Sequence, residues 1–194
     1  MNIGYATLAF KGESCCGDVG GWWQSESRQV LALADGLGHG PAAHQAAFAA
    51  MQCIERHQQA SCSALFAACD ARLLETRGAV LAIAIIDLDS NLLTLGSVGN
   101  IRSILLTSEG DVRLGAERGI VGAGYVCAAP EQKLLAPGDT LVLFSDGIDA
   151  TAVVRTCLGG AQDTPQMMAD RMLAGWALDT DDASVLVYRH GAVA

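Results

Sequence analysis

Aspartate residues stand at the ends of three apolar segments of the 194-residue sequence. Asp35 closes "LALAD" before Gly36, Asp146 closes "LVLFSD" before another glycine, and Asp181 and Asp182 precede the apolar segment "ASVLV". A carboxylate so close to a core is costly unless it is paired, hydrogen-bonded or bound to a metal. Because few lysines or arginines stand near these segments, a hard divalent cation is the economical partner, and oxygen ligands favour Mg²⁺ or Mn²⁺ over zinc.

The glycines beside these aspartates fit the same interpretation. Glycine after Asp35 allows the backbone to approach a bound group closely and leaves the Gly36 carbonyl free to act as a ligand. Asp18, in "CCGDVGG", is a fourth candidate, although Gly-Asp pairs also form simple turns. A turn explains any one Asp-Gly pair equally well, whereas three carboxylate positions at strand ends favour a metal site.

Seven apolar segments have the length and composition of β-strands, and several are apolar at nearly every position, which predicts strands covered on both faces. They are residues 5–10, 29–34, 79–87, 92–98, 102–107, 140–145 and 184–189. The tight connections at residues 87–91 and 108–111 favour antiparallel neighbours.

Helices are expected to begin at Pro41, near Ser63 and at Pro165, where Thr164 supplies an N-cap. Strands in meanders with helices grouped apart indicate an α+β fold and not an alternating βαβ chain. We therefore predict one domain, residues 1–194, built as two packed antiparallel β-sheets flanked by helices in an α-β-β-α layered sandwich.

The charge and the cysteine content of the sequence exclude several classes of function and partner. The chain carries 12 basic and 21 acidic residues, a net charge of -9, so nucleic acid and anionic membranes are not expected partners. The first ten residues lack a signal-peptide pattern and no apolar run reaches the roughly 18 residues of a membrane span, so we expect a cytoplasmic protein. The seven cysteines include no C-x-x-C pair, and we interpret most of them as buried small hydrophobic residues.

Three motifs carry a family resemblance that covers nearly the whole chain. They are "ADGLGHGPAAHQAA", "LLAPGDTLVLFSDGIDA" and "DDASVLVYR", in that order. Together they resemble the bacterial SpoIIE-type branch of the metal-dependent PPM (type 2C) serine/threonine protein phosphatases. The resemblance implies two Mn²⁺ or Mg²⁺ ions bridged by Asp35, with the Gly36 carbonyl, Asp146 and Asp181 as further ligands. Asp18 would match an earlier acidic ligand, so the implied catalytic carboxylates are those of Asp35, Asp146 and Asp181.

The resemblance also implies a reaction and a partner. A water activated by the two ions would attack a phosphoserine or phosphothreonine in line, and the substrates would be phosphorylated STAS-domain proteins of a stressosome-like complex. The chain departs from many eukaryotic members at Leu37, where those carry histidine, and has no clear match to their phosphate-binding arginine between Lys11 and Gly21. The proton donor to the leaving group stays open between a water on the metals and His39, and Asp182 is expected to support the site without binding metal.

Two other functions remain possible on the sequence alone. The first is a non-catalytic module of the same fold that docks a signalling partner, and the second is hydrolysis of a small phosphate ester. Crowded carboxylates have no purpose in a pure scaffold, which argues against the first. The pair Trp22 and Trp23 is compatible either with an exposed partner-binding patch or with a strand that turns between core and edge.

Overall fold

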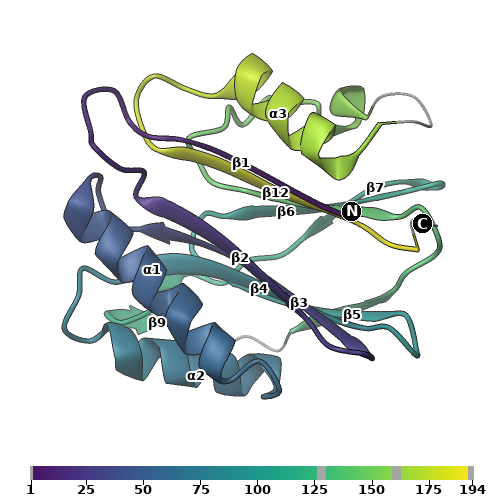
Figure 1. The fold of residues 1–194 in the computed structure, drawn as a ribbon, viewed down its shortest axis with the longest axis horizontal. Helices are drawn as coiled ribbons and strands as arrows, with labels where there is room; N and C mark the ends of the chain where they lie inside the picture. The colour runs from purple at the N-terminus through teal and green to yellow at the C-terminus, as the bar shows by residue number, and fades with distance from the viewer. Residues whose placement is uncertain (1, 126–129, 159–162, 192–194) are drawn as a thin grey trace.

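The computed structural model describes residues 2–125, 130–158 and 163–191, and in these ranges two five-stranded sheets pack face to face with helices on both outer sides (Figure 1). Neighbouring strands within both sheets are antiparallel. The predicted α+β fold of two packed antiparallel sheets flanked by helices is confirmed.

The first sheet has the strand order β1-β12-β11-β6-β7 and the second has the order β10-β5-β4-β3-β2. The first contains β1 (Ile3–Leu8), β12 (Ala183–Arg189), β11 (Thr140–Phe144), β6 (Arg102–Thr107) and β7 (Gly110–Leu114). The second contains β10 (Glu131–Leu134), β5 (Leu92–Val98), β4 (Ala79–Asp87), β3 (Arg28–Gly36) and β2 (Asp18–Gln24). A separate pair joins β8 (Gly119–Ile120) to β9 (Gly124–Tyr125).

Three α-helices form the outer layers in the described part of the chain. Helices α1 (Pro41–Arg56) and α2 (Cys62–Leu73) cover the second sheet, and α3 (Pro165–Trp176) lies over β1 and β12 of the first (Figure 1). The predicted starts of α1 and α3 at proline are confirmed, whereas α2 begins one residue before Ser63. The hydroxyls of the N-cap residues of α2 and α3 accept hydrogen bonds from amides three residues on, which satisfies donors that the helix leaves free.

The core lies in three layers because the central strands are buried on both faces. Along β4, Leu81 and Ile83 pack beneath α1 and α2, while Ala82 and Ile86 point into the space between the sheets. A third cluster joins β11 and β12 to α3. These strands are therefore apolar at nearly every position because, as predicted, both of their faces are covered.

Five short or polar strands were missed by the sequence analysis. Strand β2 is rich in glycine, and β10 is largely exposed with the sequence "EQKL", so neither has the apolar pattern of a buried strand. The other three are β7, β8 and β9. Four of the seven cysteines are buried as expected, Cys15 and Cys16 are half-buried, and Cys127 lies outside the described residues. None of the helices in the described ranges is long and apolar enough to cross a membrane.

Candidate active site

The predicted acidic residues meet at one end of the space between the two sheets. In the second sheet β2 begins at Asp18 and β3 ends beside Asp35, and these two residues are register partners. In the first sheet Asp146 follows β11, and Asp181 and Asp182 precede its antiparallel neighbour β12. In an antiparallel pair the end of one strand lies beside the start of its neighbour. The pairs β2–β3 and β11–β12 therefore place their carboxylates at the same end of the sandwich.

A buried hydroxyl network connects the sheets at this edge. The Ser184 hydroxyl, at the start of β12, donates to Asp18 Oδ2 at 2.7 Å, and the Ser184 amide donates to the Ser145 hydroxyl at 2.9 Å. Asp18 is only 3% exposed, and both serines are completely buried. The bond between Ser184 and Asp18 therefore links β12 of the first sheet to β2 of the second sheet at this end of the sandwich.

The carboxylates of Asp146, Asp181 and Asp182 are each held by a directed hydrogen bond. Asn100, in the turn between β5 and β6, donates from its side-chain amide to Asp146 Oδ2 at 2.6 Å. The backbone amide of Phe10 donates to Asp182 Oδ1 at 2.8 Å, and the amide of Asp182 donates to Asp181 Oδ1 at 2.8 Å. Asp182 is buried and Asp181 is exposed, so the two adjacent aspartates have different surroundings.

Burial and the charges of neighbouring carboxylates raise the pKa of Asp18, Asp35 and Asp146 in the fold. Desolvation, together with the charges of Asp18, Asp146 and both residues of the "DD" pair, raises the pKa of Asp35 to about 9. Desolvation raises the pKa of Asp18 to about 6, against the opposing hydrogen bonds of Ser145 and Ser184. Burial and the nearby Asp181 also raise the pKa of Asp146. A group of carboxylates that repel one another is the electrostatic setting in which a divalent cation stabilises the charged forms.

The donor atoms in this cluster fit a hard cation. Among the described residues, Asp18 Oδ1 and Asp182 Oδ2 are buried without a hydrogen-bond partner, which is costly in the absence of a bound group. All available side-chain donors are oxygens, the ligand type that Mg²⁺ and Mn²⁺ prefer. In the same ranges no three acidic, histidine or cysteine side chains already converge into a coordination shell, so metal binding requires some side chains to turn inward.

Two glycines permit the close packing that assembles the site. A Cβ on Gly36 would lie 2.0 Å from the Ala43 carbonyl oxygen of α1, and a Cβ on Gly147 would lie 2.0 Å from the Asp182 carbonyl oxygen. The sequence analysis explained the glycine after Asp35 by approach to a bound group. The structure adds a more direct reason, which is that α1 and the segment before β12 pack against the glycine backbone.

Asn100 was not found by sequence reasoning, whereas His39 and the two tryptophans were singled out in the sequence. Asn100 lies in a short turn after an apolar strand, and this position at the same sheet edge was the available signal. His39 Nδ1 contacts Glu13 Oε1 at 2.5 Å, which links the loop after Asp35 to the loop between β1 and β2. Trp23 packs against the core, whereas Trp22 is 42% exposed and its ring lies 6.1 Å from that of Tyr5.

Two packed antiparallel sheets between helices, with an acidic cluster at one edge, define the architecture of the PPM (type 2C) phosphatases. The model of the family described as stage II sporulation protein E (SpoIIE) matches residues 25–191, and the chain belongs to this family. It is a protein phosphatase of the PPM class, whose members use Mn²⁺ or Mg²⁺.

Individual relatives agree with this assignment. The phosphoserine phosphatase RsbX of Bacillus subtilis (strain 168) is 25% identical over 144 residues, which cover 72% of this chain and 70% of RsbX. A chain from a structure of the bacterial stressosome, a modular system adapted to control secondary messenger signalling, is 30% identical with a TM-score of 0.90, covering 97% of this chain and 98% of that one. A crystal structure of RsbX in complex with magnesium has a TM-score of 0.82 at 22% identity, covering 95% and 92% of the two chains.

Proposed function

We propose that this chain removes phosphate from phosphoserine or phosphothreonine on STAS-domain proteins of a stressosome-like complex, using two Mn²⁺ or Mg²⁺ ions. The observation that carries the catalytic part is the meeting of Asp18, Asp35, Asp146 and Asp181 from four strand ends at one edge of the sandwich. The family membership and the resemblance to RsbX support the choice of a phosphoprotein as substrate.

The residues that would hold the ions are Asp18, Asp35, the Gly36 carbonyl, Asp146 and Asp181. When bound, the two ions would supply an activated water and neutralise charge on the phosphoryl oxygens. Gly36 accepts no substituent on its Cα, because α1 packs against it, so its carbonyl is held in a defined position beside Asp35.

The other polar residues would orient the carboxylates. Asn100 occupies one oxygen of Asp146, and Ser184 occupies one oxygen of Asp18, so each of these aspartates keeps its second oxygen for a ligand. Asp182 would support the site through its bond from the Phe10 amide, which anchors the loop between β1 and β2. Such supporting contacts fix ligand geometry and tune metal affinity.

The choice of STAS-domain partners has two supports. RsbX, a phosphoserine phosphatase, matches 72% of the chain. The relative from the bacterial stressosome structure matches along 97% of the chain. The net charge of -9 would repel an acidic phosphoprotein at long range, so recognition must depend on local contacts.

The test is phosphate release from a phosphorylated STAS-domain protein, with and without Mn²⁺, for the native chain and for Asp146→Asn. Asp89→Asn is a matched control, because Asp89 is an exposed turn residue whose hydrogen bond to Asp87 uses only its backbone amide. We expect metal-dependent release by the native chain and the control, and loss of release in Asp146→Asn.

A stable complex with the phosphorylated partner and no release, although Mn²⁺ binds, would instead support the non-catalytic docking module. Release from p-nitrophenyl phosphate but from no phosphoprotein would overturn the choice of substrate while keeping the phosphatase chemistry. The first result would contradict the catalytic activity, and the second would contradict only the choice of a phosphoprotein substrate.

A further inference from the structure

A cavity of about 230 Å³ lies beside the acidic site, on the outer face of the first sheet. Helix α3 covers β1 and β12 on this face (Figure 1), whereas the cavity is lined by residues of β6 and β7 and of the segment that follows Asp146. The cavity floor is apolar, with Ile104 and Phe144 among its lining residues. It is therefore suited to an aliphatic side chain.

Asn100 connects this cavity to the site. Its side-chain amide donates to Asp146 Oδ2 at 2.6 Å, and the same residue lines the cavity. A substrate segment whose phosphoserine reaches Asp146 would therefore have neighbouring residues at the mouth of the cavity, since an extended chain advances about 3.3 Å per residue.

Two arginines line the cavity in an otherwise acidic chain. Arg102 donates from Nη1 to the Ile148 carbonyl at 3.1 Å and lies over the Phe144 ring at 5.8 Å, so it is part of the wall. Arg113 is exposed, and within the described ranges no hydrogen bond or ion pair engages its guanidinium. It is the register partner of Ile104 on the cavity floor.

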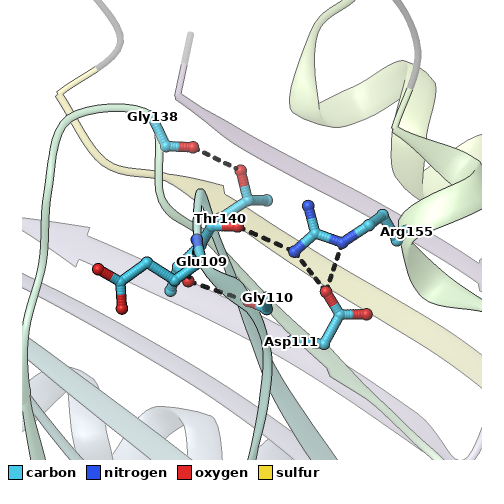
Figure 2. A network of polar contacts seen from close by, with 7 residues as sticks. Glu109, Gly110, Asp111, Gly138, Thr140 and Arg155 are labelled. Atoms are coloured by element: carbon cyan, nitrogen blue, oxygen red, sulfur yellow. Dashed lines mark hydrogen bonds and ion pairs between the residues drawn. The ribbon is translucent and has the colours of Figure 1, made fainter.

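In contrast to Arg113, the neighbouring Arg155 is held on this face by hydrogen bonds from its guanidinium. Its Nε donates to Asp111 Oδ1 at 2.5 Å and its Nη2 donates to the Thr107 carbonyl at 2.9 Å (Figure 2). These bonds tie the short helix at Val154–Cys157 to the hairpin of β6 and β7, and so hold the preceding segment as one wall of the cavity. Arg113, two residues beyond Asp111, has no such structural partner among the residues that the structure describes.

We propose that this cavity is a substrate subsite, in which an aliphatic side chain near the phosphoserine fills the apolar floor and an adjacent acidic side chain pairs with Arg113. The proposal rests on the proposed function, because it names which phosphoproteins the same site accepts. It also explains how an acidic enzyme attracts an acidic substrate, since the attraction would come from the exposed Arg113 in the cavity wall and not from the overall charge.

The test compares three phosphoserine peptides: one with adjacent leucine and glutamate, one with glutamine in place of glutamate, and one with glycine in place of leucine. For Arg113→Ala we expect kcat/KM to fall about fivefold on the glutamate peptide, the size that one exposed ion pair gives, and to stay unchanged on the glutamine peptide. Ala116→Trp, at the exposed cavity rim, should abolish the preference for leucine. Arg56→Ala, at the exposed end of α1 on the outer side of the second sheet, is the control for the loss of one positive charge.

Turnover of p-nitrophenyl phosphate should be the same in all variants, because this small ester does not reach the cavity. Equal losses on all peptides, or no loss in Arg113→Ala, would overturn the subsite. Binding of the same peptides with a non-hydrolysable phosphonate, followed by fluorescence anisotropy, separates the two proposals. An inactive protein that still prefers the glutamate peptide through Arg113 would support the subsite and overturn the catalytic function.

Discussion

Asp18 on β2 and Asp35 on β3 stand directly opposite each other in the antiparallel register. Asp18 is buried and Asp35 is half-buried, and no cation among the described residues bonds to either carboxylate. Like charges directly opposite across a strand pair destabilise a sheet, so this pairing lowers the stability of the metal-free fold. The sheet edge thus holds a repulsion that a divalent cation would relieve.

The first prediction concerns the pH dependence of the metal-free protein. The pKa of Asp35 is about 9 in the fold against 3.8 as a free side chain, so the folded state binds more protons between these values. Its contribution to stability is therefore fully present at low pH and is lost as pH rises through the folded pKa. In EDTA, the melting temperature of the native chain should fall relative to that of Asp35→Asn between about pH 6 and pH 9. Parallel curves for the two proteins would contradict the repulsion.

The second prediction concerns metal addition. If Mn²⁺ or Mg²⁺ binds the folded chain as proposed, it should raise the melting temperature with increasing concentration. At saturation we expect a rise of at least about 3 °C, which corresponds to about 1 kcal/mol in a chain of this size. Asp146→Asn should show a much smaller rise, whereas the exposed turn variant Asp89→Asn should behave as the native chain. Differential scanning calorimetry measures both.

The third prediction concerns Asn100, which holds Asp146 in place. Replacement by alanine removes the 2.6 Å bond to Oδ2 and lets the carboxylate rotate. We expect the Mn²⁺ concentration for half-maximal phosphatase activity to rise about tenfold, with most of the activity regained at saturating metal. An unchanged metal dependence would show that Asn100 does not position the ligand.

The fourth prediction concerns the close contact of Gly36 with α1. In Gly36→Ala the new Cβ would lie 2.0 Å from the Ala43 carbonyl oxygen, so the helix must shift. Loss of activity and destabilisation by at least about 2 kcal/mol are expected in urea unfolding, as for other forced overpacking. Gly175→Ala in α3 is the matched control, because its Cβ meets open space and alanine favours helix, which should stabilise by up to about 1 kcal/mol.

The fifth prediction concerns Ser184, the hydroxyl that joins the two sheets at the site. Ser184→Ala removes the hydroxyl that donates to Oδ2 of the buried Asp18. The other carboxylate oxygen, Oδ1, has no hydrogen-bond partner among the described residues in the native chain either. The metal-free protein should lose about 1 to 3 kcal/mol of stability. Saturating Mn²⁺ should restore part of this loss, and threonine at the same position, which keeps the hydroxyl, should cost less than alanine.

Among the strands that the sequence predicted, the central ones are buried on both faces. Segments such as 79–87 and 140–145 are apolar throughout because helices cover one face and the other sheet covers the second. Of the strands that it missed, β2, β7 and β10 lie at the edge positions of their sheets, where exposure permits glycine and polar residues. An edge strand can therefore lack the apolar pattern by which a buried strand is predicted, and its presence depends on the order of strands in the sheet.

The sequence by itself determined the residue types of the site, because aspartate beside glycine at the end of a buried strand is costly without a bound group, and the family motifs mark the same positions. Only the tertiary structure decided which strand ends meet, because the register of β2 with β3 and the bond from Ser184 to Asp18 depend on pairings between residues far apart in the chain. The same holds for Asn100 and Arg113, which lie in no motif: the turn after β5 places Asn100 against Asp146, and strand β7 places Arg113 in the wall of the adjacent cavity.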